Sequence, residues 1–443
     1  MSTRFLRPGS IAAALFSTLL FGLQPTLGQQ PNSSGTPPVL RLDSLLQAAE
    51  RANPSLRAAR LRAEVQAQKK PQASALPDPT VQATGHVYPT VTARGPQRSQ
   101  WQVQQSIPFP GKRELRGEIA DLNADVAGAE AEVLAQDLTL QIQRAYYDLY
   151  RVQRREEIIR AFDEELRQFE SAAATRYEVG DGSQQSILKA QVERGRLELR
   201  RENLRAERTS ALQSLARLTG RPDLRAPDRP VEVAEPSDRE VGPPPPGSTV
   251  AEARVEEARP RTEALRRRIE EAEARAALAR RAFWPDFTIG AEYTDVREDD
   301  LASTMTGRDA FKVSVGLTIP LWRDKQDARL EEAQVERRRA AAELEDFRLQ
   351  VRTEVADHRE QLRRLQRRLT LLQEELIPEA ETSLEATLSA YQSGQTDFLD
   401  LLDAERTLFQ LQLDYEDLYA QTLKTTAALE RALGRSALPA GRP

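Results

Sequence analysis

The chain carries the same series of short motifs twice, and this duplication limits its possible folds more than any other feature. Each copy contains, in the same order, an Asn-Pro or Arg-Pro pair, a Pro-Asp pair, an Ile-Pro pair, a tyrosine three residues before a glycine, and a final glycine. The first copy has these at Pro54, Asp78, Ile107, Gly180 and Gly220, and the second at Pro260, Asp286, Ile319, Gly394 and Gly434. The two series lie about 210 positions apart, beyond the roughly 20–50 residues of a solenoid repeat, so the sequence predicts a duplicated half-protein.

The repeats and the proline-rich stretches divide the chain into six expected parts. These are a signal peptide at 1–28, an extended N-terminal arm at 29–41, a first structural repeat at 42–220, a Pro-rich linker at 221–250, a second structural repeat at 251–434 and a disordered tail at 435–443. Two arginines before the apolar run 11–23 are typical of a secretory signal, and we expect cleavage after Gly28. An uncleaved anchor is the alternative, but the run is shorter than the ~20 residues of a membrane-spanning helix.

The composition is typical of long helices and excludes several kinds of site. Charged residues make up 30% of the chain and aromatic residues 5%, with alanine, glutamate, arginine and leucine dominant. The 63 basic and 68 acidic residues are mixed along the chain, which argues against a nucleic-acid surface. The absence of cysteine excludes disulfides and thiolate sites, and the two histidines, His86 and His358, are too few for a metal cage. We find no catalytic grouping, and expect neither an enzyme nor a cofactor or metal site.

Each repeat contains one segment in which apolar and polar residues alternate, at 80–107 and 286–319. The second segment is the clearer, with apolar residues at Phe311, Val313, Val315, Leu317 and Ile319. A period of two predicts β-strands with one apolar and one polar face. Strands of about 9–11 residues cross a bilayer when tilted, but an ordinary hairpin in a soluble domain fits the alternation equally well.

The segments that follow, 112–220 and 325–434, are predicted to be long helical hairpins. Residues 112–176 and 325–377 contain no proline, and leucines recur at a heptad spacing in the second stretch. These leucines are Leu362, Leu365, Leu369, Leu372 and Leu376. Pro378 predicts a kink, and the glycine turns at Gly180 and Gly394 predict that each long helix is followed by an antiparallel return helix.

Taken together, these motifs resemble the TolC-like family of outer-membrane efflux proteins, from about residue 42 to residue 434. The motifs that carry the resemblance are Asn53-Pro54, Leu76-Pro77-Asp78-Pro79, Gln105-Ser106-Ile107-Pro108-Phe109-Pro110-Gly111-Lys112-Arg113, Ala145-Tyr146-Tyr147-Asp148-Leu149 and Arg176-Tyr177 with Gly180 and Ser183, with their second-half counterparts. No single motif is specific to this family, but the order, spacing and duplication of the motifs together are specific. The Ile-Pro-Phe-Pro-Gly-Lys-Arg form is most similar to the branch that serves heavy-metal efflux by RND pumps.

The resemblance implies a mainly α fold with a small β part. Long antiparallel α-hairpins would form a periplasmic α-barrel, and four transmembrane β-strands per chain would form a twelve-stranded β-barrel in a homotrimer. The apolar strand faces would meet outer-membrane lipid, with Trp101 and Tyr293 in the aromatic girdle, and the polar faces would line water. The location implied is the outer membrane of a Gram-negative cell, with a large periplasmic part.

The function implied is transport without enzymatic activity. The trimer would be the exit duct of a tripartite efflux pump that exports small molecules or metal ions, with a periplasmic adaptor (membrane fusion) protein and an inner-membrane transporter, of RND type, as partners. Two alternatives remain: the outer-membrane component of a protein secretion system, and a soluble periplasmic coiled-coil scaffold. The sequence leaves the cargo open.

The resemblance also implies two sets of site residues. Asp400 and Asp403, which share a helix face after the second turn, would form the pore constriction; a solvated acidic stripe is the alternative. The first repeat has Ser186 and Lys189 in their place. The periplasmic tips would dock the adaptor through Gly180, Ser183, Gly394, Thr396, Arg176 and Tyr391, although both glycines are also expected simply as helix caps.

Overall fold

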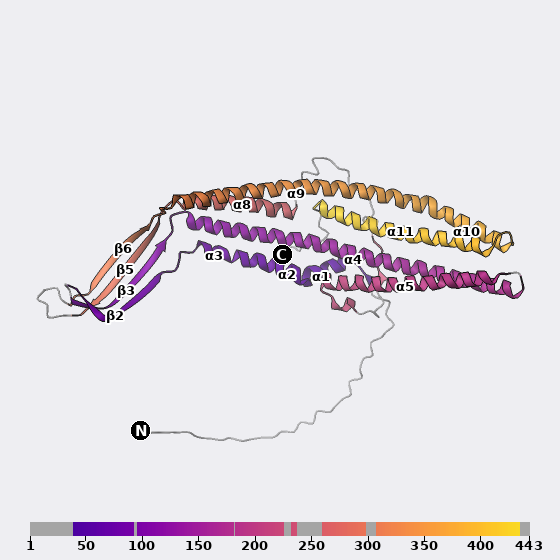
Figure 1. Cartoon of the computed structure of the whole chain (residues 1–443), viewed down its shortest axis with the longest axis horizontal. Helices are drawn as coiled ribbons and strands as arrows, with labels where there is room; N and C mark the ends of the chain where they lie inside the picture. The colour runs from indigo at the N-terminus through magenta and orange to yellow at the C-terminus, as the bar shows by residue number, and fades with distance from the viewer. Residues whose placement is uncertain are drawn as a thin grey trace, which may run out of the picture.

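The computed structural model describes residues 39–92, 95–180, 182–225, 232–236, 259–297 and 307–434. Figure 1 shows an elongated molecule with a β-sheet at one end and two helical hairpin tips at the other. The expected mainly helical fold with a small antiparallel sheet is confirmed. The proposed signal peptide, the tail and most of the linker lie outside the described residues.

The first repeat builds three short helices, a hairpin and two long helices. They are α1 (Leu42–Ala52), α2 (Pro54–Ala67), α3 (Lys69–Ser74), β2 (Thr80–Thr92), β3 (Gly95–Ile107), α4 (Lys112–Glu178) and α5 (Gln184–Thr219). The Asn53-Pro54 motif separates α1 from α2, because the Asn53 side chain accepts a hydrogen bond from Leu56 N at 2.9 Å while Pro54 begins α2. Two short strands, β1 (Val39–Leu40) and β4 (Glu232–Val233), pair beside α4.

Within the described residues, the second repeat keeps the same order, with one helix in place of α2 and α3, and with two helices joined by a π turn in place of α4. Its elements are α8 (Pro260–Arg281), β5 (Asp286–Val296), β6 (Ala310–Thr318), α9 (Arg323–Leu371), a π-helical turn (Leu372–Leu376), α10 (Ile377–Gln392) and α11 (Phe398–Ala432). The predicted irregularity at Pro378 is confirmed, since α10 begins at Ile377, directly before this proline, and the π turn ends at Leu376. None of the helices in the described part of the chain combines the length and apolar composition needed to cross a membrane.

The four long strands form one antiparallel sheet in the order β2-β3-β5-β6, so β3 and β5 join the two repeats. Rows of partners cross all four strands and alternate in character. One row is apolar, Ala83–Trp101–Tyr293–Phe311, and the next is polar, Gln82–Gln102–Glu292–Lys312. The predicted two-faced strands are therefore confirmed, and β2 and β6 are left as sheet edges without a partner in the described chain.

The helices pack through separate clusters along their length. Near the middle, buried Tyr146 donates a hydrogen bond to Ala234 O at 2.8 Å and so holds the end of β4, which lies within the expected linker, on α4. Near the tips, Phe162 of α4 stacks on Phe409 of α11 with ring centroids 4.3 Å apart, joining the two hairpins. The predicted leucine seam of α9 is buried from Leu362 to Leu372.

One sequence-based expectation about packing is met at a single residue. The heptad spacing of Leu115, Ile119, Leu122, Val126, Ala129 and Val133 predicts an α4 seam, but only Val126 is buried and the other five are half-buried. The buried face there carries small residues instead: Gly117, Ala120, Ala127 and Ala131. Small side chains allow α3, α2 and α8 to lie close against α4, which a heptad count cannot reveal.

Candidate channel elements: the sheet and the helical tips

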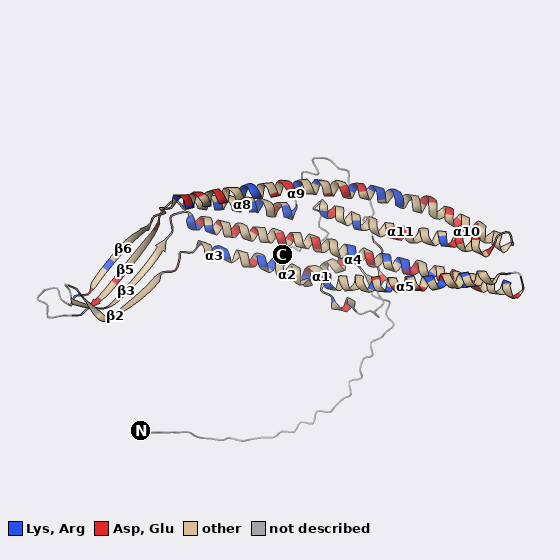
Figure 2. Ribbon diagram, viewed as in Figure 1, with Lys and Arg blue, Asp and Glu red and all other residues tan. Residues whose placement is uncertain are grey.

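The apolar face of the sheet is exposed to an unusual degree. Phe311 and Val315 of β6 are each 72% exposed, and the other large apolar side chains of this face are also largely uncovered. They are Val81, Trp101, Val103, Ile289, Tyr293, Val313 and Leu317. Figure 2 shows that acidic and basic residues are mixed along the helices but are few on the strands. A contiguous exposed apolar surface of this kind indicates an interaction with lipid or protein.

The corner between sheet and helices is held by the first repeat's Ile-Pro-Phe-Pro-Gly-Lys motif. The Phe109 ring stacks on Trp284 of the second repeat, with centroids 5.1 Å apart, and Phe109 N donates to Asp286 Oδ1 at 2.8 Å. Lys112 Nζ donates to the same Asp286 oxygen and to Trp284 O, both at 2.8 Å, and Lys112 is 6% exposed. The motif was visible in the sequence, but its role as a clasp between repeats was not.

The second tip is capped on both sides of its turn. Gly394 has φ +74°, a conformation that favours glycine, and Gln395 N donates to Ala390 O at 2.8 Å. Asp397 begins α11 by accepting hydrogen bonds from Leu399 N and Asp400 N, at 2.8 and 3.1 Å. The Thr396 hydroxyl donates to the Asp400 carboxylate.

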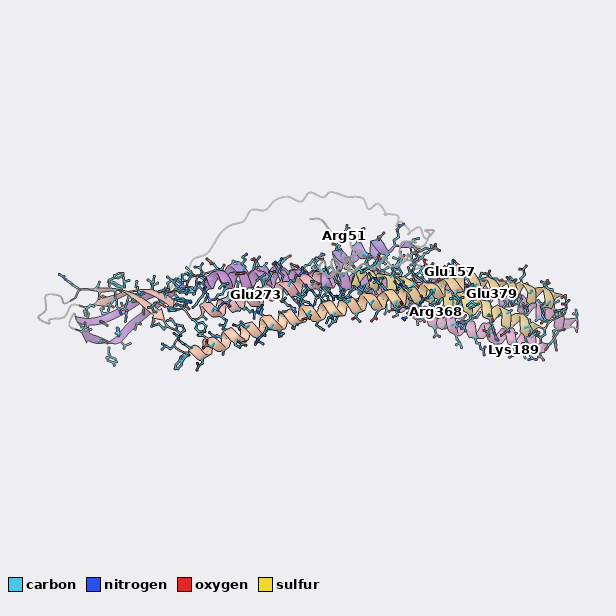
Figure 3. The ribbon with its side chains drawn as sticks, turned by 90° about the horizontal axis from the view of Figure 1, so that it is seen from above. Arg51, Glu157, Lys189, Glu273, Arg368 and Glu379 are labelled. Carbon is cyan, nitrogen blue, oxygen red and sulfur yellow. The ribbon has the colours of Figure 1, made fainter. Side chains whose placement is uncertain are left out.

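Asp400 and Asp403 lie on the exposed face of α11, while Leu401 and Leu402 between them are buried. Among the described residues, neither aspartate forms an ion pair. Both side chains therefore lie on the exposed surface of α11 without a neutralising positive charge from the described part of the chain. On α5, Lys189 is exposed near the first tip, where Figure 3 labels it.

The two tips touch each other through residues that sequence analysis singled out separately. The Arg176 guanidinium lies 4.8 Å from the Tyr391 ring centroid, and its Nη1 donates to Tyr391 O at 3.3 Å. Gly180, with φ +81°, turns the chain, and Ser183 begins α5 by accepting from Gln185 N at 3.1 Å. The sequence indicated each residue but not the Arg176–Tyr391 contact, which depends on how the hairpins pack.

Ion pairs join the repeats along the whole contact between α11 and the first hairpin. Arg431 contacts Asp137 at 2.7 Å, Arg155 contacts Asp417 at 2.8 Å and Arg406 pairs with buried Glu193 of α5. One contact between α11 and the first hairpin joins two acidic residues instead of opposite charges: buried Glu405 of α11 hydrogen-bonds to Glu165 of α4. Burial and, after it, the charge of Glu165 raise the pKa of Glu405 to about 8, so this pair holds a proton at neutral pH.

No group of three or more histidine, aspartate and glutamate residues able to hold a metal ion occurs within the described ranges. His358 is half-buried on α9, with its Nε2 4.0 Å from the Glu354 carboxylate.

Comparisons with known proteins agree with this architecture. Residues 253–435 match the family described as outer membrane efflux protein. The cobalt-zinc-cadmium resistance protein CzcC of Cupriavidus metallidurans is 24% identical over 344 residues, which are 78% of this chain and 79% of the relative.

Solved structures of outer-membrane channels share the fold at low sequence identity. The channel OprN is similar with a TM-score of 0.74 at 21% identity, over 89% of this chain and 90% of that one. VceC of Vibrio cholerae gives 0.73 at 23%, over 89% and 96%. CusC gives 0.75 at 17%, over 92% and 95%.

Proposed function

We propose that the chain, whose residues 253–435 match the outer membrane efflux protein family, is an outer-membrane channel with a periplasmic helical extension, and that three copies of it form the exit duct of a tripartite efflux pump. Membership of this family would imply a trimer and pump partners. The specific partners proposed are a periplasmic adaptor protein, which would dock at the two tips, and an inner-membrane transporter of RND type.

The observation that carries this proposal is the exposed, apolar, open-edged sheet. In lipid, a strand edge without a partner leaves backbone N–H and C=O groups unsatisfied, each at a cost of several kcal/mol. Four strands cannot close on themselves, and β2 and β6 have free edges in the described chain. Closing the sheet across three copies would remove every edge and place the apolar face toward lipid.

The helical part would continue the duct into the periplasm. Asp400 and Asp403 would form rings of carboxylates near the tips, and such rings favour cations over anions. The relative from Cupriavidus metallidurans is named for resistance to cobalt, zinc and cadmium. We therefore propose divalent metal cations as cargo ahead of neutral drugs.

Deletion of the gene and fractionation of its product test this function together. Cells that lack the chain should become more sensitive to cobalt, zinc or cadmium, and the protein should remain in the outer-membrane fraction after osmotic shock. Release of the protein by osmotic shock would instead favour a soluble periplasmic scaffold. Unchanged metal sensitivity, together with loss of a secreted protein, would favour a protein secretion role.

A further inference from the structure

A cavity of about 560 Å³ lies at the junction between the sheet and the helices, where α8 leads into β5 and β6 leads into α9 (Figure 1). Its volume is within the roughly 300–1,000 Å³ typical of ligand pockets. The clasp of Lys112 and Asp286 forms part of its wall. Most of the other lining residues belong to α8 and α9 and take no part in the contacts described above.

The floor of the cavity is apolar. Leu278 and Ala282 of α8 are four residues apart, and Ala279 and Ala282 are three apart, so these side chains share one helix face. All three are only half-buried, and Trp284 and Pro320 extend the apolar surface toward the sheet. Trp284 is 53% exposed, so much of its ring is free to contact a ligand. A floor of this kind suits the apolar tail of a small molecule.

The rim of the cavity carries an excess of positive charge. Three pairs neutralise lining charges within the chain: Lys112 with Asp286, Arg275 with Glu271 and Glu336 with Arg339. Arg116 of α4 and Arg329 of α9 also line the cavity, and neither forms an ion pair within the part of the chain that the structure describes. Arg329 Nη1 donates to Oε1 of buried Gln326 at 3.5 Å. Among the described lining residues, Glu332 is the remaining carboxylate without an ion pair, so two guanidinium groups outnumber it.

The cavity borders the polar face of the sheet. Asp286 and Thr318, which are partners across β5 and β6, both line it. Asp286 is an even number of residues from Glu292, so the two side chains share the polar face, because side chains alternate along a strand. The same holds for Thr318 and Lys312 on β6. Under the proposed function this face lines the water-filled duct, so a ligand would reach the cavity from the duct and not from lipid.

We propose that this cavity binds an amphipathic organic anion, with its apolar tail on the α8 floor and its anionic head on Arg116 and Arg329. Guanidinium groups offer several N–H donors to a carboxylate, sulfonate or phosphate. A cationic ligand would meet two positive charges against the single carboxylate of Glu332. Because the sheet and the helical duct meet here, a bound anion would also obstruct ion flow. That consequence rests on the proposed function, whereas binding to the chain does not.

The fluorescence of Trp284 gives a direct readout of occupancy. The chain has three tryptophans, so Trp101→Phe with Trp322→Phe leaves Trp284 as the reporter in the cavity. In nanodiscs, decanoate should change this fluorescence in a saturable way. Decanol has the same tail without the charge, and butyrate has the charge with a short tail. Each should bind at least about tenfold more weakly than decanoate.

Substitutions on the rim should change the affinity for decanoate in opposite directions. Arg116→Gln should weaken binding by at least about tenfold, because a charged hydrogen-bond donor is lost. Glu332→Gln should strengthen binding roughly threefold, because the competing negative charge is removed. Arg280→Gln is the matched control, since Arg280 is an exposed arginine of α8 outside the cavity lining, and it should leave the affinity unchanged.

Equal affinities for decanoate and decanol, or an unchanged affinity in the Arg116→Gln protein, would overturn the anion site. An anionic phospholipid that is extracted with the purified protein and is not displaced by decanoate would assign the cavity to lipid and overturn access from the duct. If decanoate fails to bind to protein that still carries ion current, the inference fails and the channel function stands. Saturable binding to protein that carries no current would support the site and contradict the channel.

Discussion

At the scale of single residues, the chain places two carboxylate arrangements near the tips, and they differ in burial. Asp400 and Asp403 are exposed, and the sequence pointed to both through their spacing after Gly394. Glu405, two residues further on, is buried against Glu165 and was not indicated, since only the packing of α11 on α4 shows that these side chains meet. The Arg176–Tyr391 contact was missed for the same reason.

Neutralising the exposed pair should change ion selectivity. We expect Asp400→Asn with Asp403→Asn to lower the preference for cations over anions in planar bilayers by several-fold, because the carboxylate rings would be lost. Glu379→Gln, an exposed carboxylate on α10, serves as control and should change selectivity much less. Equal selectivity in the aspartate variant and the unaltered protein would remove these residues from the pore.

The contact between buried Glu405 and exposed Glu165 should make the joint between hairpins sensitive to pH. Burial, with the charge of Glu165 second, raises the pKa of Glu405 from 4.5 to about 8, so the folded state holds this proton more tightly than the unfolded state. The stabilisation of the folded state by this bound proton is full below about pH 4.5 and is lost as the pH rises toward 8. We expect the melting temperature to fall between pH 6 and 8.5, and Glu405→Gln to flatten this decline.

Glu165→Gln is the matched control for the pH experiment. This substitution removes the charge of Glu165, which is the second cause of the raised pKa of Glu405, but leaves Glu405 buried. The melting temperature should therefore still fall with rising pH, although less than in the unaltered protein. A melting temperature with the same pH dependence in all three proteins would exclude the pair as its source.

At the scale of elements, the strands, the helical hairpins and the break at Pro378 followed from periodicity and proline, because these signals act locally. The packing face of α4 did not, because it depends on how closely α3, α2 and α8 approach. The corner clasp also escaped prediction, since Lys112 and Asp286 lie 174 residues apart. Local sequence patterns thus predicted the helices and strands, whereas the contacts between the two repeats could be identified only from the three-dimensional structure.

Breaking the clasp should destabilise the joint between sheet and helices. Asp286→Ala would leave the nearly buried Lys112 ammonium without its carboxylate, which costs on the order of 3 kcal/mol. Denaturant unfolding measures this loss. Asp121→Ala breaks the exposed Lys70–Asp121 pair instead and should cost less than about 1 kcal/mol. Equal losses in the two variants would contradict the clasp.

The glycine turns allow a test of the tips that separates backbone strain from steric conflict. A Cβ at Gly180 or Gly394 would meet no atom within 4 Å, so valine there acts mainly through its positive φ. We expect Gly394→Val to abolish efflux while the protein still reaches the outer membrane, and Gly394→Asn, which tolerates this conformation, to retain most efflux. Normal metal resistance with valine would count against docking at this tip.

At the scale of the whole molecule, the duplication gives each chain two strand hairpins and two helical hairpins, arranged along one axis (Figure 1). The copies are unequal in detail: the second carries Asp400 and Asp403, while the first has Ser186 and Lys189. The sheet is open at both edges, and its apolar face is exposed. Under the proposed function, a chain with these properties closes its sheet with further copies of itself.

Conductance of the purified oligomer in planar lipid bilayers, with its native mass determined on the same sample, tests that claim most directly. We expect a mass of three chains and stepwise, cation-preferring currents. A monomeric mass, or trimers that insert but carry no current, would contradict it.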